Sequence, residues 1–274
     1  MEKINLFILN ITVTLRCTLR CKLCVADVAK YDTPPHFEKE YLFDVIDRCF
    51  SIVDSVERFQ LSGGEPLLHK DFGEILDKSM QYRDRFHKLG IFTNGALLPK
   101  QELIDQIISY GCNEKFMIYI SDYGKNSPNA KEFAAILENA GIPYDIKDYS
   151  GLAQHAGGWV DYGDYEYQNF SEQKLKNVFK HCAVNKIGGI WSCRYGELHR
   201  CTRSASGMDL KKIPRIDEDY ISLFADIPEI EYRRVQRNKL MEIMQKPYLS
   251  ACKYCSGDFG SEDPTKRHPA GEQV

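Results

Sequence analysis

Three cysteines near the start of the chain stand at a spacing that could bind iron or zinc. The segment Cys17-Thr-Leu-Arg-Cys21-Lys-Leu-Cys24 places three thiol groups on one short loop. Three thiolates can hold three irons of a cubane cluster and leave the fourth iron open, whereas an electron-transfer cluster normally takes four protein thiolates. An open iron would be a place to bind a cofactor. A zinc site with a fourth ligand from elsewhere is the alternative interpretation.

Other short motifs carry glycine or polar residues that could contact a ligand. Each could also be an ordinary turn or helix cap, because glycine, asparagine, serine and aspartate favour such positions. Their meaning therefore depends on the elements that precede them. The motifs are Ser62-Gly63-Gly64-Glu65-Pro66, Thr93-Asn94-Gly95 and Ser121-Asp122.

The elements around these motifs alternate between strand and helix. Residues 6–15 alternate β-branched and polar positions as a strand does, and apolar residues between Phe37 and Cys49 then recur at helical spacing. Such alternation predicts βαβ units and a parallel sheet. Further strands are predicted at 58–61, 89–93, 116–121 and 143–147, and further helices after Asp71, over 100–110 and over 130–140.

The candidate motifs all stand where predicted strands end. The cysteine triplet follows the first strand, and the glycine pair follows the second. In (β/α) barrels the groups that contact ligands lie at the carboxyl ends of the strands. The motifs that could bind a ligand therefore stand where a ligand site is expected.

The CxxxCxxC loop after the first strand, followed by Gly-Gly-Glu-Pro after the second, resembles the radical S-adenosylmethionine (SAM) superfamily. The resemblance implies an α/β fold, a partial (β/α) TIM-like barrel. It implies that Cys17, Cys21 and Cys24 ligate a 4Fe–4S cluster and that S-adenosyl-L-methionine chelates the open iron. It also implies that the glycines let the backbone approach the methionine amine and that Glu65 faces the ammonium. The residues so assigned are Gly63, Gly64, Glu65 and Pro66.

Two weaker matches follow the third and fourth predicted strands. Thr93 with Asn94, and Ser121 with Asp122, fall where relatives place polar groups near the SAM carboxylate and ribose. The chain departs from the family at Leu23, because members often have an aromatic residue before the third cysteine, in contact with adenine. This departure concerns adenine stacking and not the cluster ligands.

A second cysteine-rich region follows residue 170. Cys182, Gly196 and Cys201 follow the pattern C-x13-G-x4-C, and a CxxC pair comes later. This pattern resembles the SPASM and twitch extensions, which carry auxiliary 4Fe–4S clusters. The resemblance implies a radical SAM barrel over 1–170 and a twitch-like extension over 171–274, with a β-hairpin turning near Gly196 plus a helix. The implied cluster ligands, which could instead hold structural zinc, are Cys182, Cys201, Cys252 and Cys255.

Three cysteines remain outside these two sets. Cys49 lies on the apolar stripe of the first predicted helix, so we expect it in the core. Cys112 follows a helix end and is expected to be structural. Cys193 shares the hairpin with Cys201; it could be a ligand, a hydrogen-atom donor or a core residue.

The family resemblance also implies a class of reaction. In this superfamily SAM is cleaved to a 5′-deoxyadenosyl radical that removes a substrate hydrogen atom. In length and cluster content the chain is similar to aminocyclitol dehydrogenases of the superfamily. We therefore expect a radical SAM oxidoreductase that dehydrogenates a polar small molecule, such as a sugar or aminocyclitol alcohol. The alternatives are maturation of a ribosomal peptide, by cross-linking or epimerisation, and a non-enzymatic zinc-binding protein.

The loop 151–167 is the candidate substrate wall. His155 could take the alcohol proton as a general base. Asp161 or Arg194 could orient hydroxyl or amine groups of the substrate. Each of these residues could also belong to an ordinary solvent-facing loop.

Composition limits the partners of the chain. The 274 residues carry a net charge of -3, which excludes the strongly basic face that nucleic-acid binding needs. The apolar start contains Asn10, Thr12 and Thr14, so it is predicted to be a buried strand and neither a signal peptide nor a membrane span. We expect a cytoplasmic protein, in which ten cysteines favour metal binding or catalysis over disulfides. The expected partners are the substrate and an electron donor such as flavodoxin or ferredoxin, with no nucleic acid and no membrane.

Overall fold

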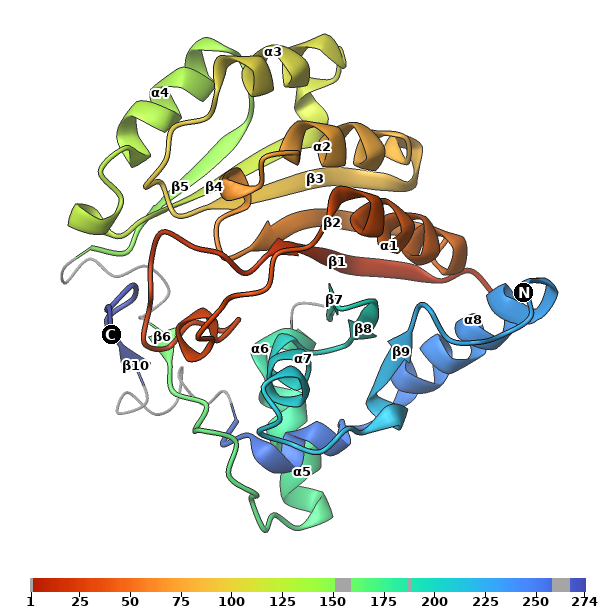
Figure 1. Ribbon diagram of the computed structural model, residues 1–274. Coiled ribbons are helices and arrows are strands. Elements are labelled where there is room, and N and C mark those ends of the chain that lie inside the picture. Colours follow the sequence, from red (N-terminus) through yellow and green to blue (C-terminus); the bar gives the residue numbers. More distant parts are fainter. Residues whose placement is uncertain (1, 151–158, 187–188, 258–266) are drawn as a thin grey trace.

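A computed structural model of the chain describes residues 2–150, 159–186, 189–257 and 267–274. One eight-stranded sheet, in the order β5-β4-β3-β2-β1-β7-β8-β9, organises these residues. Strand β1 (Asn5–Thr14) lies inside this sheet between β2 and β7. Figure 1 shows α1–α4 together on one side of β1–β5, with the later helices on the other side of β1.

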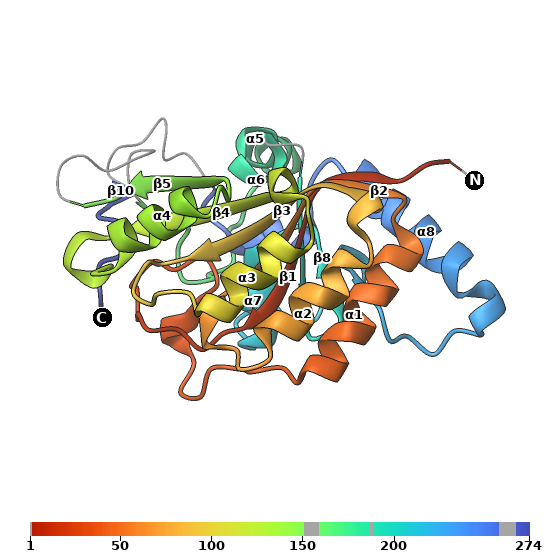
Figure 2. The same ribbon diagram turned by 90° about the horizontal axis from the view of Figure 1, so that it is seen from above.

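The first half of the chain forms parallel β/α units, as predicted. Strands β1 to β5 pair in parallel with their sequence neighbours, and the sheet does not close. Figure 2 shows α1, α2 and α3 side by side along these strands. The partial (β/α) barrel is confirmed. The elements are α1 (Lys39–Ile52), β2 (Ser55–Gly63), α2 (Phe72–Met80), β3 (Phe86–Thr93), α3 (Gln101–Ser109), β4 (Phe116–Asp122), α4 (Ala130–Asn139) and β5 (Tyr144–Asp148).

Burial explains why β1 carries so many apolar and β-branched residues. Every residue of this strand from Ile8 to Thr14 is buried, because helices cover one face and the C-terminal region covers the other. Helix α1 packs Val45, Ile46 and Cys49 into the same core, in which Phe59 is fully buried. The prediction that Cys49 is a core residue is confirmed.

The second half of the chain extends the same sheet. Strand β7 (Ile190–Arg194) pairs in parallel with β1, and β8 (Glu197–His199) and β9 (Tyr220–Ser222) follow in antiparallel order. Tyr195 and Gly196 both have positive φ, which is the geometry of a two-residue hairpin turn. The hairpin predicted near Gly196 is therefore confirmed, although the boundary at residue 170 remains a prediction. The helices here are α5 (Glu172–His181), α6 (Ala183–Lys186), α7 (Thr202–Asp209) and α8 (Glu229–Gln245).

Short elements complete the described fold. Strands β6 (Trp159–Val160) and β10 (Arg267–His268) form an antiparallel pair. The 3-10 helices are η1 (Val28–Lys30), η2 (Pro66–Leu68), η3 (Arg83–Arg85), η4 (Asn113–Lys115), η5 (Gly124–Asn126), η7 (Asp217–Asp219) and η8 (Ser250–Tyr254).

The last residues of the chain return to the cysteine loop near its start. The backbone N–H of Lys22 donates to the carbonyl of Glu272 at 2.7 Å, and that of Val274 donates to the carbonyl of Arg20 at 3.0 Å. An isolated bridge joins Cys21 to Gln273. Residues separated by most of the chain therefore form one wall around this loop.

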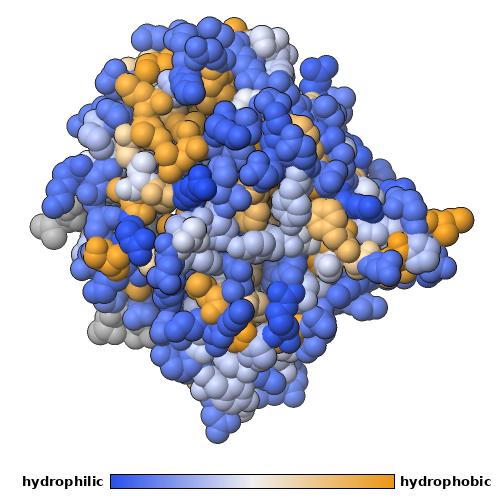
Figure 3. Space-filling view, in the orientation of Figure 1, coloured by the Kyte–Doolittle hydropathy of each residue, from blue (hydrophilic) through white to orange (hydrophobic). Residues whose placement is uncertain are grey.

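Most of the surface drawn in Figure 3 is polar, with an apolar patch in its upper part. A surface groove of about 680 Å³ is lined by Leu67, Leu68, Leu97, Leu98 and Pro99, among others. None of the helices in the described ranges is long and apolar enough to span a membrane.

Candidate functional site

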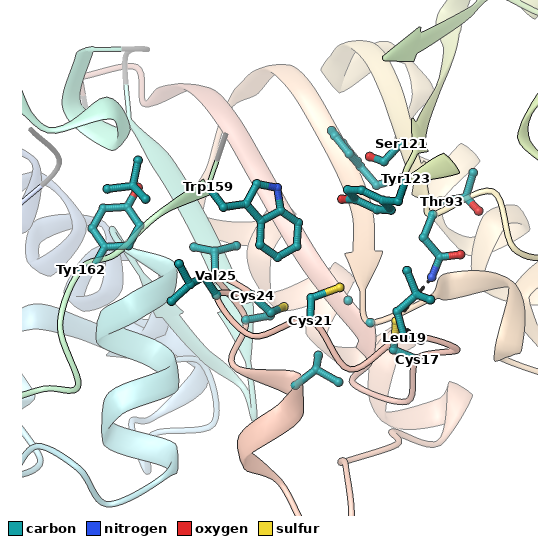
Figure 4. A pocket seen from close by; sticks show the side chains of 18 residues that line it. Cys17, Leu19, Cys21, Cys24, Val25, Thr93, Ser121, Tyr123, Trp159 and Tyr162 are labelled. Atoms are coloured by element: carbon teal, nitrogen blue, oxygen red, sulfur yellow. Dashed lines mark hydrogen bonds between the residues drawn. The ribbon is translucent and has the colours of Figure 1, made fainter. Parts of the chain in front are cut away.

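The three cysteines of the first loop face one cavity at the carboxyl ends of β1 to β4. The cavity measures about 390 Å³. Figure 4 shows the cysteine side chains on one side of this space, with the rings of Tyr123 and Trp159 on the other. The predicted site residues that line the cavity are Cys17, Cys21, Cys24, Gly63, Gly64, Thr93, Asn94 and Ser121.

In the metal-free protein the three thiols of the first loop resist ionisation. Burial raises the pKa of Cys17 to about 11 and also raises the pKa of Cys21 and Cys24. The neighbouring thiolates raise the pKa of Cys17 and Cys21 further, since like charges repel. A bound metal overcomes both effects because a coordinating thiol loses its proton. The donor set therefore fits an iron–sulfur cluster.

Hydrogen-bond donors also point at two of these sulfurs. The backbone N–H of Leu19 lies 3.4 Å from Cys17 Sγ, and the side-chain amide of Gln273 lies 3.3 Å from Cys21 Sγ. Donors to sulfur stabilise the thiolate and tune the potential of iron–sulfur clusters.

Gly63 and Gly64 allow the end of β2 to pack against the start of the cysteine loop. A Cβ on Gly63 would lie 1.9 Å from the carbonyl oxygen of Thr14, and one on Gly64 would lie 2.3 Å from that of Arg16. The N–H groups of Gly64 and Glu65 donate to these same two oxygens, each at 2.8 Å. The glycine pair therefore holds the cysteine loop in place while it lines the cavity.

Glu65 does not line the cavity, and its contact with the methionine ammonium remains a prediction. The side chain is fully buried, and its carboxylate accepts hydrogen bonds from Leu67 N at 3.2 Å, Thr93 Oγ1 at 3.0 Å and Asn94 N at 2.8 Å. Burial raises the pKa of Glu65 to about 7 although these donors favour the charged form. Pro66, which is also buried, is not among the residues that line the cavity. Glu65 thus positions the ends of β2 and β3 relative to each other.

Asn94 links the end of β3 to the cysteine loop. Its Nδ2 donates to Thr18 Oγ1 at 2.9 Å and approaches Cys17 Sγ at 3.4 Å. The side chain is buried and lines the cavity, as does that of Thr93. Both residues therefore stand where the family resemblance predicted, and their contact with SAM remains a prediction.

Ser121 and Asp122, at the end of β4, have different roles. Ser121 lines the cavity, whereas Asp122 Oδ1 accepts a hydrogen bond from Gly124 N at 2.8 Å and closes the turn after the strand. Asp122 is not among the residues that line the cavity. For Asp122 the structure matches the alternative interpretation, a turn residue.

Aromatic side chains form one wall of the cavity; Trp159 and Tyr162 belong to the predicted substrate loop, whereas Phe92 and Tyr123 were not predicted. The rings of Tyr123 and Trp159 meet edge to face at 5.7 Å, and Phe92 and Tyr162 also line the cavity. Leu23 lines it too, at the position where relatives often have an aromatic residue. Tyr123 directly follows the Ser121-Asp122 motif in the chain, and this position could have indicated that it lines the cavity.

Residues 159–167 of the predicted substrate loop belong to the described structure. Trp159 and Tyr162 line the cavity, whereas Asp161 Oδ1 accepts from Gly163 N at 2.8 Å within a tight turn. His155 lies outside the described residues, so its assignment as a base stays a prediction.

A second cavity of about 40 Å³ lies among the four later cysteines. Cys182 ends α5, Cys201 precedes α7, Cys252 lies in η8, and Cys255 directly follows η8. All four residues line this cavity, so the structure brings the four predicted ligands together.

Burial and neighbouring sulfurs disfavour the ionisation of three of these thiols. Burial raises the pKa of Cys182 to about 12, and the neighbouring thiolates of Cys201 and Cys255 contribute to that rise. Burial also raises the pKa of Cys201 and Cys252, and the other three sulfurs raise the pKa of Cys252 further. Thiols that line one cavity in this way can give up their protons to a bound metal.

Neither cysteine set resembles a site for one ion. Across the described ranges, no three His, Cys, Asp or Glu side chains close on a point that a single metal ion could occupy. The sulfurs of each set border a cavity, of about 390 Å³ for the first set and about 40 Å³ for the second.

Cys193 and Arg194 do not reach the first cavity. Cys193 is 1% exposed and lies in the hydrophobic core beside Cys49, so the assignment of Cys193 as a catalytic residue is wrong. Arg194 is 3% exposed, and its Nη1 donates to Ser206 Oγ at 3.1 Å and Tyr31 OH at 3.2 Å. Its predicted role in orienting substrate is likewise wrong, because these internal contacts hold the guanidinium inside the protein.

Part of the chain matches a known family and known proteins. Residues 11–121 match the family model described as the radical SAM superfamily. The chain is 32% identical over 93 residues to a GTP 3′,8-cyclase of Stenotrophomonas maltophilia and 30% identical over 95 residues to an S-adenosylmethionine-dependent nucleotide dehydratase of Selenomonas ruminantium. These matches cover 34% and 35% of this chain, and only 28% and 32% of those proteins.

Solved structures share the fold over most of the chain. The structure of BtrN in complex with AdoMet and 2-DOIA aligns with a TM-score of 0.52 and 17% identity, over 94% of this chain and 95% of that one. Native anSMEcpe with bound AdoMet aligns with a TM-score of 0.53 and 14% identity, over 98% of this chain and 93% of that one. At these identities the likeness concerns the fold.

Proposed function

We propose that the chain, of which residues 11–121 match the radical SAM superfamily model, is an oxidoreductase of that superfamily with two 4Fe–4S clusters that removes two electrons from a polar small molecule. The first cluster would be held by Cys17, Cys21 and Cys24, and the second by Cys182, Cys201, Cys252 and Cys255. When bound, SAM and the first cluster supply a 5′-deoxyadenosyl radical that abstracts hydrogen, and the second cluster supplies an electron acceptor.

The four-cysteine cavity is the observation that carries this proposal. Four cysteines from three segments of the chain line this cavity, and the neighbouring thiolates raise the pKa of Cys182 and Cys252 beyond the effect of burial. Four protein thiolates saturate a cluster, which suits electron transfer and leaves no open iron for a substrate. A net oxidation needs such an acceptor, whereas a rearrangement does not.

The residues of the first cavity would bind SAM and the substrate. Gly63 and Gly64 present backbone to the methionine end of SAM, and Asn94 and Ser121 offer polar groups beside it. The rings of Tyr123 and Trp159 would pack on the C–H faces of a cyclic substrate and exclude water. His155 remains the predicted base for the alcohol proton.

Two substrate classes follow from the comparisons. The BtrN structure contains 2-DOIA, which supports aminocyclitol or sugar alcohols as the first compounds to test. The curated relatives are named for GTP and nucleotide chemistry, which makes nucleotides the second class. An electron donor such as flavodoxin or ferredoxin and a cytoplasmic location stay predictions.

Anaerobic reconstitution and turnover would test the proposal. We expect about eight irons and eight sulfides per chain, since each cluster contains four of each. A Cys252→Ala/Cys255→Ala variant should lose about half of both and still cleave SAM when dithionite supplies electrons. Turnover with deuterated aminocyclitols should place deuterium in 5′-deoxyadenosine and yield a ketone. The double variant should form no ketone.

Specific results would contradict the proposal. Zinc without labile sulfide in the second site would exclude the electron acceptor. Ketone formation by the double variant would show that the second site is not needed for oxidation. Deuterium transfer from nucleotides and not from aminocyclitols would show that the substrate is a nucleotide.

A further inference from the structure

Arg203 lies between the two cavities. Its side chain lines the four-cysteine cavity together with Tyr165. The guanidinium stands over the ring of Tyr165, 4.2 Å from its centroid, and over the ring of Tyr162 at 5.3 Å. Tyr162 in turn lines the first cavity. The described structure thus puts the permanent positive charge of Arg203 beside the second cysteine set. The ring of Tyr162 lies between this charge and the first cavity.

The guanidinium is incompletely paired. Nη2 donates to the carbonyl oxygen of Gly163 at 2.9 Å, whereas Nε is buried and, within the described ranges, has no hydrogen-bond partner. An arginine stays charged in proteins. Cys201 and Cys255 line the same cavity as Arg203. The charge of Arg203 therefore lies beside the sulfurs of the second set.

Asp27 supplies an opposite charge on the far side of Tyr165. The Tyr165 hydroxyl donates to Asp27 Oδ2, and the aspartate is 5% exposed. Lys30 Nζ lies 3.3 Å from Asp27 Oδ1.

We propose that Arg203 raises the reduction potential of the cluster held by Cys182, Cys201, Cys252 and Cys255, and that Asp27 lowers it from the other side of Tyr165. This inference rests on the proposed function, because it requires a cluster in the second site. Arg203 is a positioning and tuning residue here, since it touches the cysteine cavity and no reacting atom of a substrate.

The physical reason is the charge that a cluster gains on reduction. A reduced cluster carries one more negative charge than the oxidised cluster, so a nearby cation favours the reduced form. The effect is strong where water is excluded, because the interaction between two charges is stronger in a low-dielectric interior than in bulk water. Buried groups are also screened little by salt.

A redox titration followed by electron paramagnetic resonance would measure this effect. The full chain with Cys17→Ala, Cys21→Ala and Cys24→Ala isolates the signal of the second cluster. In this background Arg203→Met and Arg203→Gln remove the charge, and Arg203→Lys keeps it. Two neutral variants are used so that the effect of the charge can still be measured if one of them does not fold.

The matched control is Arg58→Gln. Arg58 on β2 also has a buried Nε without a partner in the described residues, and its guanidinium stands 5.6 Å from the ring of Tyr119. It lines neither cysteine cavity. Loss of its charge therefore reports the general effect of removing a half-buried arginine.

We expect a more negative potential in the neutral Arg203 variants, a potential near that of the parent in Arg203→Lys, and no shift in Arg58→Gln. Asp27→Asn should shift the potential in the positive direction, and asparagine tolerates the positive φ of this position. Equal potentials in the parent and the neutral variants would overturn the inference. An equal shift in Arg203→Lys would overturn it too, because packing and not charge would then be responsible.

Iron and sulfide analysis separates this inference from the proposed function. Absence of the second cluster in the parent protein would refute the proposed function. Presence of the cluster with an unchanged potential would refute the role of Arg203 alone.

Discussion

The side-chain amide of Gln273 lies 3.3 Å from the sulfur of Cys21, although 252 positions separate the two residues in the chain. The same side chain accepts a hydrogen bond from Arg20 N at 2.7 Å through its Oε1. Gln273 therefore holds the cysteine loop and donates to one of its sulfurs at once. The C-terminal end of the chain thus contributes to the first cavity without lining it.

Replacing Gln273 by Ala should make the potential of the first cluster more negative. The amide favours the reduced cluster because it donates to a sulfur that becomes more negative on reduction. A redox titration of the Cys252→Ala/Cys255→Ala background isolates this cluster. Gln106→Ala is the control, since Gln106 Nε2 donates to Gly73 O and Tyr110 OH and to no sulfur. Identical potentials in parent and Gln273→Ala would refute the role of the amide.

The buried carboxyl of Glu65 should give the metal-free protein a distinct pH dependence. Burial raises its pKa from 4.5 to about 7, so the folded state binds more protons than the unfolded state between these values. The contribution of Glu65 to stability is therefore fully present below about 4.5 and is lost as the pH rises to about 7. The free energy of unfolding of the parent, measured relative to Glu65→Gln by urea titration, should decrease over this window. A constant difference between the two proteins would contradict the raised pKa.

A methyl group on Gly64 should disrupt the cysteine loop. The added Cβ would lie 2.3 Å from the Arg16 carbonyl oxygen, and only movement of the backbone can relieve this clash. We expect Gly64→Ala to lower the free energy of unfolding by about 2–4 kcal/mol and to retain little iron. Gly73→Ala is the matched control, because its Cβ would meet only the flexible side chain of Gln106. Thermal unfolding and iron content measure both, and a Gly64→Ala protein with full iron and stability would show that the loop adapts.

The core position of Cys193 predicts a change in stability and not in chemistry. Cys193→Ala should lower the free energy of unfolding by about 1–2 kcal/mol, since it removes a buried group from a packed core. The rate of 5′-deoxyadenosine formation with substrate should stay that of the parent. Cys112→Ala, at a half-buried position, controls for the loss of a thiol outside the core. A folded Cys193→Ala protein that abstracts hydrogen but cannot return it would instead support epimerisation.

Spacing and periodicity in the sequence were sufficient for the order of elements from β1 to β5, for the hairpin at Gly196 and for the positions of the cysteine loops. The β/α alternation, the cysteine loop after β1, the glycine pair after β2 and the hairpin at Gly196 all depend on residues close together in the chain. Such features are local, because strand and helix periods and turn preferences act over a few residues. The family resemblance rests on the same short segments, and it also named the four later cysteines that meet in the second cavity.

The directions of buried side chains were decided only by the tertiary structure. Glu65 turns inward because donors from β3 reach it, and Arg194 and Cys193 are internal because β7 joins the sheet beside β1. Gln273 meets Cys21 across most of the chain. These relationships depend on contacts between distant segments, and the free energy of such contacts arises only when the packed core brings the segments together. The sequence therefore determined which chemistry is present, and the fold decided which side chains take part in it.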